Sequence, residues 1–273
     1  MTVGVEERAR RRRALSCFRS VVFCYWLTIC LAAPAVMAAT ACPADHIDER
    51  ARVAYVHDGD TVRLQDGRRL RLIGVDTPEL SRDGKPDQPY AVAARDALRG
   101  VLAKGAALDL RFDKNRQDVH GRLLAHAFFA DGRSVSAWLL ERGYATLLTV
   151  PPDDWNVSCY QAAERRARAQ RLGIWGLPRY QPVAANRLQE TARGYHLIKG
   201  RVVHVGDSAR SLWLDLEGNV AARIDRQDLG YFASLALHEL KNKTVIVRGW
   251  VYPYHHELQL RLRYPTDLEI VEH

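Results

Sequence analysis

The sequence predicts a mainly β protein with additional α-helices (α+β), organised as two domains. Short stretches in which apolar and polar residues alternate recur along the chain, separated by Gly, Asp and Pro, which is typical of strands. Three segments before residue 178 instead show a helical period. Residues 178–194, rich in Pro, Gln, Asn and Ala, separate two such patterns and are predicted to be a linker. The 273 residues are enough for two hydrophobic cores.

The N-terminal segment, 1–38, has the pattern of a secretory signal peptide. Six arginines precede or begin an apolar run at 21–36, and Val36-Met37-Ala38 is a small-x-small cleavage sequence. We therefore expect a secreted or periplasmic protein with no stable membrane partner after cleavage. The alternative is an uncleaved segment that anchors the chain in a membrane, although the apolar run is short for a spanning helix. Half of the formal charge of +8 lies in this segment, so the remaining chain is only mildly basic.

Two cysteines, Cys42 and Cys159, remain after the predicted cleavage. An even count in an exported protein predicts one disulfide between them. The alternative is two free thiols, which an oxidising compartment disfavours. No second cysteine lies within four residues of either one, so their spacing does not suit a metal site.

The first predicted domain, 39–177, begins with strands at 51–76, where Asp66-Gly67 is a hairpin turn and 70–75 the return strand. A helical period runs from Pro89 to Leu102. Alternating apolar residues, turn residues and helix caps predict the later elements in the same way. They are strands at 107–112 and 123–129, a helix through Glu141 with Ser134 as its N-cap, and a helix at 159–172 with Ser158 as its N-cap.

The second predicted domain, 195–273, contains five strand-like segments with a helical or irregular insert between the third and fourth. The segments are 197–205, 211–216, 220–224, 244–252 and 257–262. This order is the outline of an OB-fold, and the alternative is another small β-barrel or meander. Its aromatic residues and arginines could form a groove for single-stranded nucleic acid; alternatively the aromatics are core and the arginines are solvated. They are Trp213, Tyr231, Tyr252 and Tyr254 with Arg201, Arg248, Arg261 and Arg263.

Acidic oxygens gather where the first strands end. Asp60 and Asp76 lie at strand ends that a hairpin brings together. Carboxylate oxygens suit Ca²⁺ or Mg²⁺ and suit zinc poorly, and Ca²⁺ tolerates an open, irregular shell better than Mg²⁺ does. Glu79 follows Thr77-Pro78, whose proline redirects the chain. This places its carboxylate outside the metal shell, where it could deprotonate an attacking water.

Two arginines complete the set. Arg71 lies on a strand face that becomes apolar and therefore needs an anionic partner, and Gly121 suggests a tight turn that orients Arg122. Planar guanidinium groups match phosphate oxygens and keep their charge. Each residue alone has an ordinary structural explanation: Asp58 and Asp118 as turn residues, and Arg71 as a salt-bridge partner of Asp76. Their combination in this order favours phosphodiester hydrolysis.

The combined motifs closely resemble those of the staphylococcal nuclease (thermonuclease) family. The resemblance covers about residues 52–176 and rests on 58–62, 71–79, 105–113, Gly121-Arg122 and Gly173-Ile174-Trp175. It implies an OB-type five-stranded barrel with three helices. It also implies Ca²⁺-dependent cleavage of DNA and RNA by water, leaving 3′-phosphate ends.

By position, the resemblance assigns roles to individual residues. Asp60 and Asp76 would bind calcium through carboxylates and Thr77 through its carbonyl, Glu79 would act on water, and Arg71 and Arg122 would hold the phosphate. The chain departs from the family where Val119-His120 replaces a lysine–tyrosine pair, which makes His120 a candidate substrate-binding residue. Residues 148–151 also lack the tyrosine that stacks on a base, and Trp155 is a candidate replacement.

Three classes of function compete. The first is an exported, metal-dependent nuclease acting on DNA, RNA or both. The second is a nuclease-fold module that binds nucleic acid without catalysis, and the third is an envelope interaction protein whose C-terminal barrel is the functional part. The intact set of Asp60, Asp76, Glu79, Arg71 and Arg122 favours the first. The preference for DNA or RNA, the mode of cleavage and the oligomeric state stay open.

Overall fold

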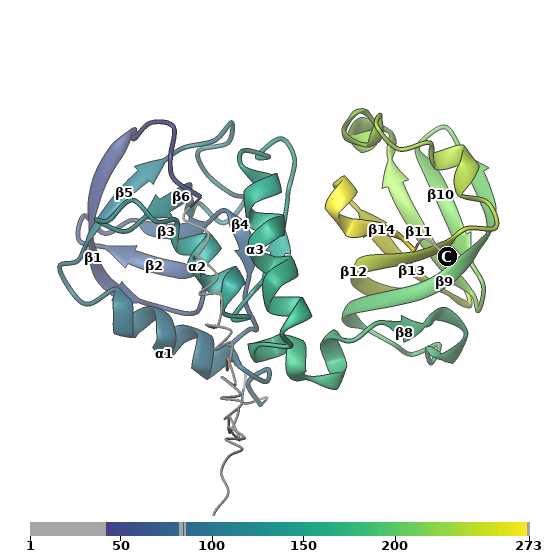
Figure 1. Cartoon of the computed structure of the whole chain (residues 1–273), viewed down its shortest axis with the longest axis horizontal. Coiled ribbons are helices and arrows are strands. Elements are labelled where there is room, and N and C mark those ends of the chain that lie inside the picture. Colours follow the sequence, from purple (N-terminus) through teal and green to yellow (C-terminus); the bar gives the residue numbers. More distant parts are fainter. Residues whose placement is uncertain (1–41, 82–83, 85, 272–273) are drawn as a thin grey trace, which may run out of the picture. The chain divides into compact units, whose positions relative to one another are not determined.

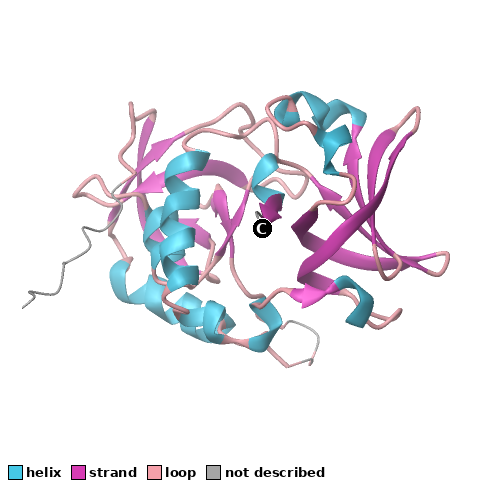
Figure 2. Ribbon diagram, turned by 45° about the vertical axis from the view of Figure 1, so that its right-hand side comes forward, coloured by secondary structure: helices cyan, strands magenta, loops and turns pink. Residues whose placement is uncertain are grey.

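The computed structural model describes residues 42–81, 84 and 86–271. The predicted signal peptide, 1–38, lies outside these residues. Within the described part, none of the helices combines the length and the apolar character needed to span a membrane. The described chain builds two β-barrels, the first accompanied by three α-helices and the second by short 3₁₀ turns (Figures 1 and 2).

The first barrel closes in the strand order β1-β2-β3-β6-β5. The neighbouring strands β3 and β6, which are the third and fifth barrel strands in sequence order, run parallel. The other neighbouring pairs are antiparallel. This is the OB-type order that the sequence predicted. The strands are β1 (Glu49–Val56), β2 (Thr61–Leu64), β3 (Arg69–Leu72), β5 (Ala107–Arg111) and β6 (Leu123–Phe128).

Three helices cover this barrel (Figure 1). α1 (Ala91–Val101) buries the periodic face of Ala91, Ala94 and Leu98. α2 (Val135–Glu141) begins after Ser134, whose hydroxyl accepts a hydrogen bond from Ala137 N, as predicted for an N-cap. α3 (Val157–Ala169) begins after Asn156.

The predicted cap of α3 is wrong. Asn156 has φ 58°, and its carbonyl accepts hydrogen bonds from the amides of Cys159 and Tyr160. Asparagine adopts this left-handed conformation more readily than most residues. The sharp bend at Asn156 lets the helix begin at Val157, so Ser158 lies inside its first turn.

The predicted strand at 70–75 is also divided in the structure. Gly74 has φ 88°, and a Cβ there would lie 2.6 Å from Tyr160 Cε2. The chain therefore turns at Gly74, and β4 (Gly74–Asp76) leaves the barrel to pair with β7 (Thr146–Leu148). Because of this turn, Asp76 pairs with Thr146 of β7, whereas β3 before the turn pairs with β6.

The second barrel repeats the order of the first. Its strands follow the order β9-β10-β11-β13-β12, and pairing between β12 and β9 closes the barrel. The third and fifth strands in sequence order, β11 and β13, are again parallel. β8 (Val183–Ala184) and β14 (Leu268–Val271), which the sequence did not predict, add to its edges. The OB-type interpretation is confirmed. The strands are β9 (Gly194–Asp207), β10 (Ser211–Leu216), β11 (Val220–Asp225), β12 (Thr244–Tyr254) and β13 (Glu257–Leu262).

The two barrels share buried contacts. Trp175 and Ala167 pack with Leu197 in a small apolar cluster. Beside it, the buried Glu164 of α3 forms a 2.6 Å ion pair with the buried Arg248 of β12. Glu164 also accepts a 2.7 Å hydrogen bond from Leu147 N in β7. One carboxylate thus joins β12 to the strand that supports β4.

A disulfide joins Cys42 to Cys159, as the cysteine count predicted. It connects the start of the described chain to α3, with the two Cα atoms 5.8 Å apart.

Candidate active site

Asp60 lies directly before β2, and hydrogen-bond donors surround its carboxylate. Its Oδ2 accepts hydrogen bonds from Thr77 N and Thr77 Oγ1, both at 3.1 Å, and its Oδ1 accepts one from Thr61 Oγ1. Gly59 allows this approach, because a Cβ there would lie 2.7 Å from Thr77 Oγ1. The Asp58-Gly59-Asp60 segment is thereby locked against Thr77, next to Asp76.

Arg71 joins the two carboxylates that the sequence singled out. Its Nη2 lies 3.1 Å from Asp60 Oδ2 and 3.1 Å from Asp76 Oδ1. Its Nη1 donates to the carbonyls of Leu72 and Val75 at 2.7 and 2.8 Å. Both the predicted salt bridge and the convergence of the two carboxylates therefore occur in the structure.

The site holds more negative than positive charge. Burial raises the pKa of Asp76 to about 7 although Arg71 opposes the shift, and the charges of Asp60 and Glu79 add to it. Burial likewise raises the pKa of Asp58, and its neighbour Asp60 contributes. Burial lowers the pKa of Arg71, but the surrounding carboxylates, led by Asp60, more than offset this and keep its pKa raised. A cation would relieve this excess.

Glu79 follows Pro78 and is exposed. It is near enough to Asp76 and Arg71 for its charge to raise the pKa of both groups. Its carbonyl accepts a 3.0 Å hydrogen bond from Gln88 N, which fixes the backbone beyond the proline.

Arg122 approaches the site from the turn before β6. Asp118 holds it twice, through a 2.6 Å contact with its Nε and a 2.9 Å hydrogen bond from its backbone N. Its Nη1 lies 3.4 Å from Thr61 Oγ1, which in turn contacts Asp60. Asp118 and Thr61 are positioning residues that the sequence did not identify as such.

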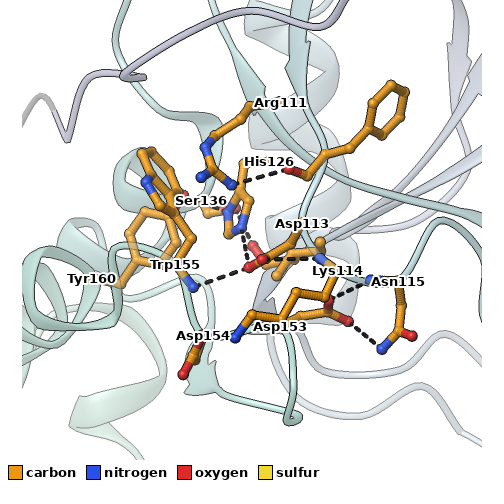
Figure 3. A network of polar contacts seen from close by, with 12 residues as sticks. Arg111, Asp113, Lys114, Asn115, His126, Ser136, Asp153, Asp154, Trp155 and Tyr160 are labelled. Atoms are coloured by element: carbon orange, nitrogen blue, oxygen red, sulfur yellow. Dashed lines mark hydrogen bonds and ion pairs between the residues drawn. The ribbon is translucent and has the colours of Figure 1, made fainter.

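A polar network anchors the segment that carries this turn (Figure 3). Asp113 accepts a 3.0 Å hydrogen bond from Trp155 N and lies 3.4 Å from Nε2 of the buried His126. Asn115 donates to Asp153 from both its backbone and its side chain. Residues 113–115 are therefore tied to the loop at 149–156, which stabilises the start of the turn that presents Arg122.

Arg71 and Arg122 line one cavity of about 630 Å³. Asp76 lines a neighbouring cavity of about 310 Å³. Leu148 and Arg263 line both, so the two cavities adjoin. Arg263 comes from the second barrel, and its place here depends on packing between distant segments.

Two predicted substrate contacts fall outside this cavity. His120 is exposed and is not a lining residue; its backbone N donates to Asp118, while the 95% exposed Val119 lines the cavity instead. Trp155 is packed against His126, with ring centroids 4.8 Å apart, and beneath the guanidinium of Arg111 at 4.2 Å. These contacts hold its ring against the barrel, and it does not line this cavity.

The oxygen donors fit a hard divalent cation. Asp60 and Asp76 lie close together because both contact Nη2 of Arg71, and Thr77 is hydrogen-bonded to Asp60 beside them. Within the described residues no group of three or more His, Cys, Asp or Glu has metal-binding geometry. A hard divalent cation here would thus rely on two carboxylates and complete its shell with a carbonyl, water and substrate.

Comparison with known proteins gives a consistent assignment. The family model described as "Staphylococcal nuclease homologue" matches residues 69–176. A thermonuclease from Staphylococcus intermedius is 35% identical over 126 residues, which cover 45% of this chain and 74% of the relative. Endonuclease YncB from Bacillus subtilis is 34% identical over 128 residues (45% and 60%), and a thermonuclease from Staphylococcus hyicus is 32% identical over 127 residues (45% and 74%). The chain belongs to the staphylococcal nuclease family.

Proposed function

We propose that this chain is an exported, Ca²⁺-dependent nuclease that hydrolyses phosphodiester bonds of DNA, RNA or both and leaves 3′-phosphate ends. Family membership makes it a nuclease hydrolase that acts on nucleic acid. The observation that carries the proposal is the contact of a single nitrogen of Arg71 with both Asp60 and Asp76. It shows that the acidic and cationic halves of the motif meet at one place.

The proposed roles follow from charge and position. Asp60, Asp76 and the carbonyl of Thr77 would hold the cation, which when bound supplies positive charge beside the phosphate. The guanidinium groups of Arg71 and Arg122 donate hydrogen bonds to phosphate oxygens and stabilise the charge that develops during attack. Glu79, exposed beside them, accepts a proton from the attacking water. The bond between phosphorus and the 5′ oxygen breaks, so the phosphate remains on the 3′ oxygen of the preceding nucleotide.

Export is supported by the disulfide. Cys42 and Cys159 are joined, and such bonds persist in oxidising compartments such as the periplasm or the extracellular space. The signal-like segment at 1–38 leads to the same proposal.

The proposal is tested by digesting denatured DNA with the purified protein in Ca²⁺, in excess chelator, and after Ca²⁺ is restored. We expect cleavage only in the first and third conditions. Product ends should resist extension by a polymerase until a phosphatase removes the 3′ phosphate. Cleavage that persists in chelator, or products that are extended without phosphatase, would refute the metal dependence and the end chemistry respectively. Binding without cleavage in Ca²⁺ would support a non-catalytic module instead.

A further inference from the structure

Cavities continue from the active site across the second barrel. Leu148 and Arg263 line both the cavity of Arg71 and Arg122 and the neighbouring one of about 310 Å³. Arg223 and Tyr252 line this second cavity together with a third, of about 540 Å³. The three cavities therefore form one path that starts at the candidate catalytic residues and ends on the second barrel.

The side chains along this path come from one face of the second barrel. The strand register places Trp213 of β10 beside Arg223 of β11, and Arg223 beside Arg261 of β13. In a neighbouring row Gln259 of β13 stands beside Tyr252 of β12. Most of their neighbours in sequence are buried in the core, so cationic and aromatic groups interleave across four strands.

Aromatic rings on this path have surface available for stacking. Trp250, which lines the second cavity, is 53% exposed, and Tyr254, which lines the third, is 54% exposed. Because about half of each ring is exposed, these two residues are not part of the hydrophobic core. They offer flat faces of the kind on which unpaired bases stack.

The positive charge along the path is unevenly neutralised. Arg223 and Arg261 each lie 3.0 Å from Asp225, and Arg261 also lies 2.6 Å from Asp228. By contrast, the guanidinium of Arg263 has no hydrogen-bond or ion-pair partner among residues 42–81, 84 and 86–271; only its backbone N is bonded, to Asp267. Arg263 is thus a cation that borders the active-site cavity and has no side-chain partner among the described residues.

We propose that the second barrel binds the single-stranded part of the substrate next to the bond that is cut. Arg263 contacts a phosphate beside the scissile one, and Trp250 and Tyr254 stack with the bases that follow along the path. The proposal rests on the proposed nuclease function. It makes the second barrel an extension of the substrate site and favours unpaired strands, because paired bases cannot reach these rings.

The test compares Arg263→Ala and Trp250→Ala with the wild-type protein on single-stranded DNA of about 4 and about 16 nucleotides, the range of site sizes of one OB-type barrel. For the longer strand we expect KM to rise about tenfold for Trp250→Ala with kcat unchanged, since stacking on one ring is lost. For the shorter strand the rise in KM should be much smaller. Arg263→Ala should also reduce the slope of log affinity against log salt by about 0.7, the value for one lost phosphate contact.

Arg201→Ala is the matched control. The sequence offered Arg201 as a candidate groove residue, but in the structure it is an exposed arginine that lines none of the three cavities and pairs with Glu217 at 3.7 Å. It should leave both substrates unaffected. The proposal is overturned if Arg263→Ala and Trp250→Ala retain the wild-type KM on the long strand, if the effect of Trp250→Ala is independent of length, or if Arg201→Ala has the same effect.

A binding measurement separates this proposal from the proposed function. The affinity of a fluorescein-labelled strand of about 16 nucleotides for the Glu79→Gln protein can be followed by fluorescence anisotropy in chelator. Strand binding that is weakened by an added Arg263→Ala supports the inference even if the wild-type protein fails to cleave. Equal affinity with and without Arg263→Ala contradicts it even if the wild-type protein cleaves.

Discussion

Two kinds of contact position the residues of the site: ion pairs between charged side chains, and close packing of the backbone against side chains, as at Gly59 and Thr77. Asp60, Arg71 and Asp76 could be identified from the sequence because they lie close together in it and their residue types are chemically specific. Arg122, which lies far along the chain, could be identified from its Gly-Arg turn, and Thr77 from the family resemblance. The structure brings these five together through direct or one-step contacts. Arg263 could not be assigned to the site in this way, because its proximity depends on how two barrels pack.

Gly59 gives the sharpest test of this arrangement. A methyl group at this position would meet the side chain of Thr77 at 2.7–2.8 Å, and Thr77 can withdraw only by giving up its hydrogen bonds to Asp60. We expect Gly59→Ala to lower the free energy of unfolding by about 1–3 kcal/mol, the usual cost of overpacking, and to reduce activity. Urea unfolding and a cleavage assay measure the two effects.

Gly100→Ala is the control for this substitution. Gly100 lies in α1, and a Cβ there would have no atom within 4 Å. Alanine should therefore stabilise the protein by about 0.5–1 kcal/mol through its better helix propensity. A Gly59→Ala protein as stable and active as Gly100→Ala would contradict the close packing described around Asp60.

At the scale of elements, periodicity predicted most helices and strands but not their interruptions. The core strands of both barrels follow alternations visible in the sequence. The break between β3 and β4 depends on the side chain of Tyr160, which lies far along the chain and approaches Gly74. The start of α3 depends on the left-handed Asn156, and the short edge strands β8 and β14 form by pairing with β9 and β12. Such features are set by tertiary contacts.

The disulfide belongs to this scale because it fastens the start of the described chain to α3. Cys42 and Cys159 are 117 residues apart, so the bond closes a long loop in the unfolded chain. We expect the double variant Cys42→Ser/Cys159→Ser to lose about 2–4 kcal/mol of stability. Urea unfolding with and without a reductant measures it: reductant should destabilise the wild-type protein and leave the double variant unchanged. Equal sensitivity of the two proteins would contradict the bond.

At the scale of the whole molecule, one buried ion pair links the second barrel to the active site. Arg248 of β12 holds Glu164, Glu164 holds the backbone of Leu147, and β7 pairs with β4, which ends at Asp76. The second barrel therefore supports the strand that carries a candidate metal ligand, in addition to lining the path beyond it.

Glu164→Gln tests this link. The substitution would leave the buried charge of Arg248 without its carboxylate, so we expect a loss of about 3–5 kcal/mol in the free energy of unfolding. Glu269→Gln is a matched control, because Glu269 also pairs with an arginine of α3, Arg168, but at a partly exposed position. It should cost less than about 1 kcal/mol. Similar losses for both variants, measured by urea unfolding, would show that burial of the pair is unimportant.

The central claim, that the residues around Arg71 hydrolyse phosphodiesters with Glu79 as the proton acceptor, is tested most directly by kcat on single-stranded DNA for Glu79→Gln. The substitution keeps the size of the side chain and removes its basic carboxylate. The account predicts that kcat falls by about 10²–10⁴-fold, the usual contribution of general acid–base catalysis, while Glu190→Gln, at an exposed position, keeps the wild-type value. A Glu79→Gln protein with wild-type kcat would contradict it.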